Sequence, residues 1–260
     1  AAAMPQCASI IRWVDTPLTG MGKARRVLPS LLDIQLPFKL EECACEFPRV
    51  ERKPGGHVRG LAAVARVSDV AQRLGELRAR NIDPFFLDQE SLALWTQGLA
   101  EWPVHSGGAG LQSLRALVYL GASRTVMVLG RGSVFISAHS LHGLRADQVI
   151  RLLRAQCEEP GGAPPPVDWL WVGPEAAQRE TIDSFLRDIG GKDPVVSHIA
   201  FDPELFLPRA LAVRVRTNAP LPCNLRGGEI AHPLLSLQRQ RRSRMMALAC
   251  LAAGLLLVVA

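Results

Sequence analysis

The sequence predicts an α/β fold made of two consecutive halves, followed by an apolar helix. Three observations predict it. Apolar stretches of strand length alternate with amphipathic helical patterns along the chain. A glycine-rich stretch, VHSGGAG (residues 104–110), separates the two halves. The last 16 residues are uncharged and almost wholly apolar. We therefore expect four parts, which are a first half (1–106), a second half (107–222), a juxtamembrane strip (223–244) and the start of a membrane span (245–260).

The first half is expected to begin with a helix and a hairpin. The segment VLPSLLDIQLPF (27–38) predicts a short helix that Pro37 ends, because proline cannot continue the hydrogen-bond ladder. Two extended runs on either side of Pro54-Gly55-Gly56 predict a β-hairpin. This half therefore starts with local structures that neighbouring residues can form on their own.

The rest of the first half gives a second helix, a strand and a third helix. Val67, Val70, Leu74 and Leu77 recur at helical spacing, and Ser68 or Asp69 is the expected N-cap. DPFFLD (83–88) predicts a short buried strand, and QESLALWTQGLA (89–100) predicts a helix.

The second half predicts three strands followed by alternating helices and strands. LRALVYL, TVMVLG and SVFISAHSL are joined by the short turns GASR and RG, which is typical of an antiparallel meander. The following helix has one apolar face, formed by Ala146, Val149, Ile150, Leu153 and Cys157. After the loop GGAPPPVD (161–168) we expect a strand (WLWVG), a helix with the apolar residues Ile182, Phe185, Leu186 and Ile189, a strand (PVVSHIAF) and a last helix (PRALAVRVR). Two such α/β halves predict the duplicated, ribonuclease-H-like architecture of actin-like proteins, incomplete at its start.

Charge and cysteine content exclude several classes of function. The formal net charge is +6, and the four arginines Arg239, Arg241, Arg242 and Arg244 account for four of these charges. The remaining chain is nearly balanced and has no basic face with interleaved aromatic residues, so nucleic acid is not an expected partner. The six cysteines form no zinc-binding spacing and are expected to be reduced.

The apolar end of the chain, MMALACLAAGLLLVVA (245–260), predicts the start of a transmembrane helix. A membrane span needs about 20 residues, so the alternative is a buried helix. The arginines directly before the segment favour a span, since basic residues remain on the cytoplasmic side of a membrane. We expect a single-pass protein whose N-terminal domain is cytoplasmic.

The turn VYLGASRT (118–125) resembles a phosphate-binding turn that has lost its acid. Actin-like proteins carry Asp-x-Gly-x-x-Thr at such a turn, and here Gly121, Ser123 and Thr125 occupy the matching region while Tyr119 replaces the acid. A phenol is a poor ligand for Mg²⁺, although the backbone amides could still hold an anion. Arg124 favours a contact with a phosphate or a partner carboxylate. We expect no catalytic residue, no metal and no cofactor, with passive ATP binding as an open alternative.

Several longer strings resemble the GspL and PilM proteins of type II secretion and type IV pili. These strings are ALVYLGASRTVMVLGRGSVFISAHSLHG, NIDPFFLDQESLAL and LPSLLDIQLPFKLEECACEF. CNLRGGEIAHP (223–233) is similar to the element that precedes the single membrane span of GspL, and PilN carries a related Asn-Leu motif. The start of the chain departs from this family, whose members begin with a further pair of strands.

The resemblance implies a non-catalytic inner-membrane platform protein of a type II secretion system. It implies that the protein tethers a GspE-like secretion ATPase, couples it to pseudopilus assembly, and contacts a GspM-like protein and inner-membrane lipid. A homodimer is an open alternative to a monomer. The residues expected to contact partners or the membrane are Asn224, Leu225, Glu229, Arg239, Arg241, Arg242 and Arg244. Two alternatives are an ATP-binding pilus assembly protein, in the form of a PilM–PilN-like fusion, and a membrane-tethered kinase. The kinase would need an acid in the phosphate turn.

Overall fold

The computed structural model describes residues 1–102, 114–156, 167–176, 179–189, 195–197, 199, 201–216 and 220–234. Five predictions lie outside these residues, wholly or in greater part: the linker 104–110, Cys157, the loop 161–168, the arginines of 239–244 and the apolar segment 245–260. Within the described part of the chain, no helix is both long enough and apolar enough to cross a bilayer.

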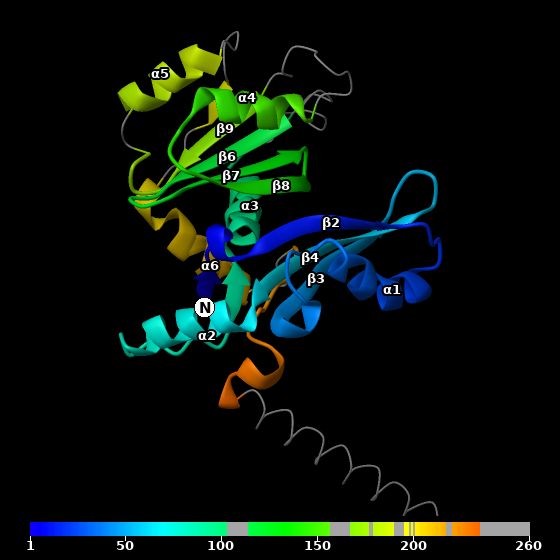
Figure 1. The fold of residues 1–260 in the computed structure, drawn as a ribbon. Helices are drawn as coiled ribbons and strands as arrows, with labels where there is room; N and C mark the ends of the chain where they lie inside the picture. Colours follow the sequence, from blue (N-terminus) through cyan, green and yellow to red (C-terminus); the bar gives the residue numbers. More distant parts are fainter. Residues whose placement is uncertain are drawn as a thin grey trace, which may run out of the picture.

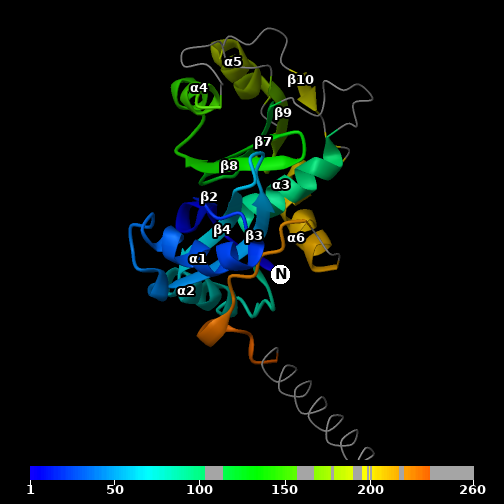
Figure 2. The same cartoon turned by 90° about the vertical axis from the view of Figure 1, so that its right-hand side faces the viewer.

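The elements follow one another as alternating groups of strands and helices (Figures 1 and 2). In chain order they are β1 (Ala2–Met4), β2 (Ile10–Thr16), α1 (Met21–Asp33), β3 (Cys43–Arg52), β4 (Val58–Arg66), α2 (Val67–Arg78), β5 (Leu87–Gln89), α3 (Glu90–Glu101), β6 (Leu114–Leu120), β7 (Thr125–Arg131), β8 (Val134–Leu141), α4 (Ala146–Arg154), β9 (Val167–Val172), α5 (Arg179–Ile189), β10 (Val195–Ser197) and α6 (Phe206–Arg216).

The second half forms a five-stranded mixed sheet with the order β10-β9-β6-β7-β8. Strands β6, β7 and β8 pair antiparallel, which confirms the predicted meander, and β9 and β10 extend the sheet in parallel with β6. Side chains alternate between the two faces of β6. Val118 packs in a cluster with α4 and α5, whereas Leu117 packs in a cluster with α3. Figure 1 shows α4 and α5 on one side of this sheet and α3 on the other.

The first half contains two smaller sheets. Strands β2, β4 and β3 form an antiparallel sheet in that order, and β1 pairs in parallel with β5. The β3–β4 hairpin confirms the prediction, and Gly55 and Gly56 adopt positive φ angles in its turn. Strands β1 and β2 were not predicted. The Trp13 side chain of β2 donates to the Phe135 carbonyl of β8 at 3.1 Å, which joins this sheet to the five-stranded one.

Helix α1 confirms the predicted helix over residues 27–33, but both of its bounds lie upstream of the predicted ones. It begins at Met21 rather than Val27, and it ends at Asp33, before Pro37 is reached. Its buried residues are Ala24, Leu28 and Leu32, so the apolar spacing continues one turn upstream of the predicted start. Pro29 lies inside the helix, and the chain turns away directly after Asp33.

Two further details of the first half were also wrong. Helix α2 covers the predicted apolar residues, but it follows β4 directly, so its N-cap is Arg66 and no side chain caps it. The predicted buried strand 83–88 is limited to Leu87–Gln89, and Phe85 and Phe86 are exposed. The extended pairing begins only where β5 meets β1.

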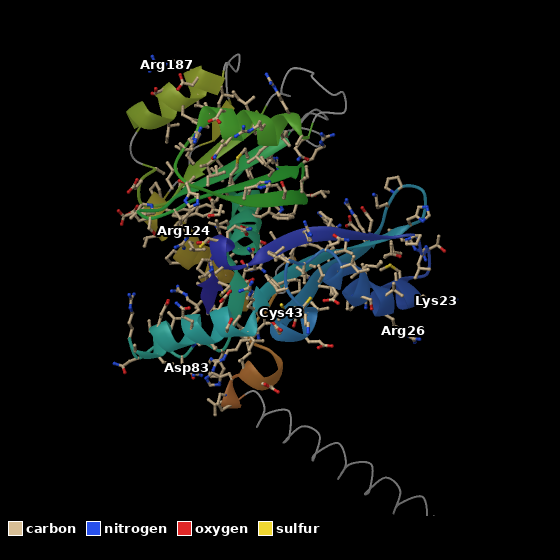
Figure 3. The ribbon with its side chains drawn as sticks, viewed as in Figure 1. Lys23, Arg26, Cys43, Asp83, Arg124 and Arg187 are labelled. Atoms are coloured by element: carbon tan, nitrogen blue, oxygen red, sulfur yellow. The ribbon has the colours of Figure 1, made fainter. Side chains whose placement is uncertain are left out.

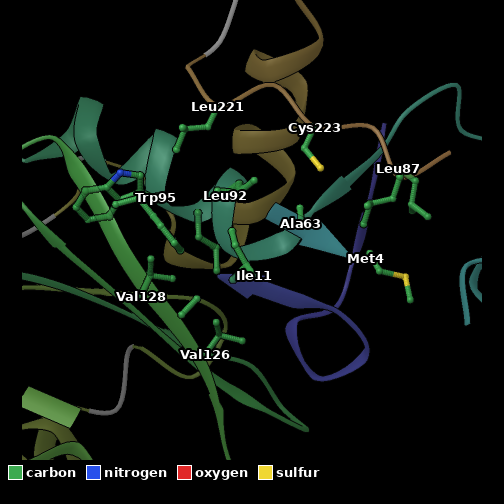
Figure 4. Close-up of a cluster of buried hydrophobic side chains, with 14 of the residues drawn as sticks. Met4, Ile11, Ala63, Leu87, Leu92, Trp95, Val126, Val128, Leu221 and Cys223 are labelled. Atoms are coloured by element: carbon green, nitrogen blue, oxygen red, sulfur yellow. The ribbon is translucent and has the colours of Figure 1, made fainter. Parts of the chain in front are cut away.

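One hydrophobic cluster joins the two halves around α3. Trp95 of α3 is fully buried, and it shares this cluster with Val126 and Val128 of the five-stranded sheet. Leu221 and Cys223 from the end of the described chain belong to the same cluster (Figure 4). The segment that follows α6 is therefore part of the folded body.

Candidate functional site

The turn predicted to bind phosphate joins β6 to β7. The Gly121 amide donates to the Arg124 carbonyl at 2.9 Å, and Leu120 and Thr125 face each other across the pair of strands. Ser123 is exposed and Thr125 is buried. This hydrogen bond closes the connection between the two strands and already gives the Gly121 amide an acceptor, so that amide is not available to an anion.

Tyr119 lies on β6 just before this turn and is half-buried. Burial raises the pKa of its hydroxyl, the charge of Glu90 raises it further, and Arg124 acts in the opposite direction. The hydroxyl therefore remains a neutral phenol at ordinary pH. It supplies none of the negative charge that the aspartate of this turn supplies to a metal ion in ATP-binding proteins.

Arg124 turns inward and binds a carboxylate of its own chain. Its Nη2 lies 2.5 Å and its Nε 3.2 Å from Oε1 of Glu90, at the start of α3. The Glu90 side chain has 0% exposure, and its other oxygen accepts the Gln6 amide at 2.9 Å. Burial lowers the pKa of Arg124, but the hydrogen bond and charge of Glu90 outweigh that effect and raise it. The arginine that could have held a phosphate is thus engaged with Glu90.

Gly173, which follows β9, packs closely against the end of β6. Gly173 adopts φ +102°, and a Cβ atom there would lie 2.5 Å from the Leu120 carbonyl oxygen. This glycine is needed for packing of β9 against β6, rather than for approach to a ligand. A cavity of about 610 Å³ adjoins Tyr119. Among the described residues, no lysine or arginine lines this cavity, and those that do are Ala1, Tyr119, Pro174, Glu204, Leu207, Pro208, Leu211 and Ala212.

These observations do not fit bound ATP·Mg²⁺. The turn offers no carboxylate, its arginine is paired, and the adjacent cavity carries Glu204, whose charge would repel phosphates. Among the residues that the structure describes, no group of three histidine, cysteine or acidic side chains could hold a metal ion.

The second candidate site is the segment 221–234, which we call the docking segment. The Leu225 amide donates to the Leu87 carbonyl at 2.8 Å, and the Leu87 amide donates to Oδ1 of Asn224 at 3.1 Å. The same Asn224 oxygen accepts the Arg226 amide at 3.1 Å. Asn224 and Leu225, two residues predicted to contact a partner, thus lie against β5 of their own domain.

Arg226 fixes the docking segment to the loop before β5. Its side chain is fully buried, its Nη1 lies 2.6 Å from Oδ1 of Asp83, and the same atom donates to the Pro84 carbonyl. Its Nε donates to the Ile230 carbonyl at 3.1 Å, which closes the segment on itself. The hydrogen bond from Arg226 is the main cause that lowers the pKa of Asp83.

His232 adds a second contact to the same loop. Its ring stacks on Phe85 with centroids 4.1 Å apart, and its Nε2 lies 3.3 Å from Oδ2 of Asp83. Its Nδ1 accepts the Leu234 amide at 3.1 Å. Because Nδ1 is the acceptor, the neutral ring can donate from Nε2 to the carboxylate.

Arg214 of α6 holds the start of the docking segment. It forms a buried ion pair with Asp88 and donates to the Leu221 carbonyl at 2.6 Å and to the Thr96 hydroxyl at 2.7 Å. Burial raises the pKa of Asp88, and the nearby Arg214 only partly offsets this effect. One guanidinium thus connects β5, α3, α6 and the segment.

Of the other residues predicted to contact a partner or the membrane, only Glu229 lies among the described residues. Glu229 is exposed in a short turn of the docking segment, and the four arginines of 239–244 lie outside the described residues. Sequence reasoning did not find Glu90, Arg226 or Asp83. Their partners are far away along the chain, so no local pattern marks them.

The chain shares its fold with a solved structure of the "PilM-PilN type IV pilus biogenesis complex", at 17% identity and a TM-score of 0.62, with 82% of this chain and 78% of that chain covered. A second match is the cytoplasmic domain of EpsL, an inner-membrane component of the type II secretion system of Vibrio cholerae, at 14% identity and a TM-score of 0.48, with 87% and 76% covered. A third is a Bacteroides thetaiotaomicron protein with an actin-like ATPase fold and unknown function, at 9% identity and a TM-score of 0.42, with 81% and 72% covered. No protein-family model and no curated protein matches the sequence. Together with the mixed five-stranded sheet, the first match shows that the chain shares its fold with the PilM–PilN structure.

Proposed function

We propose that this chain is a non-catalytic platform protein of the inner membrane in a type II secretion system. In this role it tethers the cytoplasmic secretion ATPase and couples it to pseudopilus assembly. The observation that carries the proposal is the docking segment, which binds the folded body through Leu225 and Arg226 within the predicted juxtamembrane strip (223–244). A rigid connection of this kind is suited to passing force between a membrane anchor and a cytoplasmic domain.

The phosphate turn supports the non-catalytic part of the proposal. Phosphoryl transfer needs a metal or cationic residues that stabilise the charge of the transferred phosphate. Here Arg124 is neutralised by Glu90, and Tyr119 provides no metal ligand. The work of the protein would then consist of contacts with other proteins and with lipid.

One specific observation favours an alternative function. The match to a PilM–PilN complex is consistent with a pilus assembly protein in which both parts are fused in one chain. In that case the docking segment would correspond to the PilN motif, and the chain would bind ATP.

The experiment that tests the proposal is recovery of partners from the native membrane. The chain carries an affinity tag before Ala1, is cross-linked in its own cells, and is purified from the membrane fraction. Recovery of a type II secretion ATPase supports the proposal. Recovery of a pilus ATPase favours the alternative, and recovery of neither ATPase contradicts both.

A further inference from the structure

Helix α1 carries a group of cations that no residue of the described chain neutralises. Lys23, Arg25 and Arg26 are exposed and have no ion pair or hydrogen bond among the described residues, and no acid lies in the first turn of α1. Cations at the N-terminal end of a helix also oppose its dipole. The placement of these three cations is therefore unfavourable in the isolated molecule, and it points to an anionic partner outside the molecule.

The exposed side of α1 combines charge with apolar surface. Val27 is 37% exposed and Ile34 is 82% exposed, and helical spacing places both on the same stripe as Lys23 and Arg26. The opposite stripe packs on the three-stranded sheet and is buried. The helix thus has a second face that is basic and partly apolar.

This face lies toward the end of the molecule from which the chain leaves the described body. In Figure 1, α1 lies under its three-stranded sheet, in the same half of the molecule as the end of the docking segment. Figure 3 shows Lys23 and Arg26 at the lower right and Asp83 at the lower left. Exposed apolar side chains, Ile82, Phe85 and Leu234, lie in the loop and segment near Asp83.

We propose that the exposed face of α1 lies against an anionic lipid surface, as a membrane contact separate from the predicted anchor. The proposal rests on the membrane location proposed above. A lipid surface fits better than a protein ligand because the helix face is convex, and no residue of α1 is among the described residues that line the cavities of about 630, 450 and 610 Å³. Clustered lysine and arginine residues bind such a surface without a shaped pocket, and the apolar side chains between them reach the headgroup region.

The test compares lipid contact in membranes that differ in charge. The 260-residue chain is inserted into nanodiscs of phosphatidylcholine alone or of phosphatidylcholine mixed equally with phosphatidylglycerol, and amide hydrogen exchange of α1 is measured. We expect exchange in α1 to slow on the anionic discs, by about fivefold for each cation that engages lipid. The variant Lys23→Glu/Arg25→Glu/Arg26→Glu should lose this difference.

A matched control carries the same number of charge reversals at the opposite end of the molecule. Arg151, Arg154 and Arg187 are exposed on α4 and α5, and their replacement by glutamate should leave the exchange of α1 unchanged. Circular dichroism of all variants should be unchanged, which reports that their total helix content is retained.

The outcomes test the lipid contact of α1 and the proposed membrane anchoring separately. Equal exchange of α1 on both kinds of disc overturns the lipid contact and leaves the basic face to an acidic protein. Protection that persists in the α1 variant overturns it as well. A chain that fails to insert into either disc contradicts the proposed membrane anchoring itself, so that failure is distinguishable from failure of the lipid contact.

Discussion

Replacement of Arg226 by alanine should separate the docking segment from the domain. The side chain donates to Asp83 and to the carbonyls of Pro84 and Ile230. A hydrogen bond to a charged group contributes roughly 1.5–3 kcal/mol and a neutral one roughly 0.5–1.5 kcal/mol. Asp83 is 38% exposed, so the lower end applies to that contact. We expect a loss of about 3 kcal/mol in the free energy of unfolding.

The assay is urea unfolding, with Arg78→Ala as the matched control. Arg78 also pairs with Asp83, at 3.4 Å, but its side chain is 53% exposed. An exposed pair of this kind contributes about 0.5 kcal/mol or less. In Arg226→Ala the Leu225 amide should also exchange faster, because its acceptor on β5 is released. A loss below about 1 kcal/mol, or one equal to that of the control, would refute the stabilising role of the buried Arg226 contacts.

Three further predictions concern the core and the turn. Gly130→Ala should destabilise the fold by about 3 kcal/mol in thermal unfolding, because the new Cβ would lie 2.0 Å from the Trp95 ring; an unchanged melting temperature would contradict this packing. Arg124→Ala should cost about 3 kcal/mol in urea unfolding, since it leaves the buried Glu90 carboxylate without its cation; a loss below about 1 kcal/mol would argue against the ion pair. Tyr119 is the single tyrosine, so phenolate absorbance reports its pKa, which should lie above 10. Because the folded pKa is raised, the stability from the neutral phenol is present below the unfolded pKa and is lost as pH rises through the folded one. A midpoint at or below the ordinary value would contradict the burial of this side chain.

The sequence predicted those elements that local pattern determines. The β6–β8 meander has short turns between apolar runs, and its strands pair with their immediate neighbours in the chain. Helix α2 and helix α3 follow from apolar spacing, and Gln89 at the start of α3 caps it by accepting the Leu92 amide. Local signals of this kind need no knowledge of distant partners.

The sequence did not predict the elements whose partners are far away along the chain. Strand β2 pairs with β4, with Ile10 facing Val64, and no turn between them marks the pairing. In the site, Arg124 and Glu90 are 34 residues apart, so the sequence could indicate that the arginine would bind an anion or carboxylate but not which one. Asn224 was expected to make a contact, yet its acceptor role toward Leu87 became visible only in the fold.

The most direct test of the central claim is a calorimetric titration of the chain with ATP·Mg²⁺, beside the variant Tyr119→Asp. The phosphate turn lacks its acid, and its arginine, Arg124, is paired with Glu90. The natural chain should therefore give no heat of binding, and the variant should give heat only if the acid alone was missing. Tight binding of ATP by the natural chain would contradict the account and favour the ATP-binding pilus alternative.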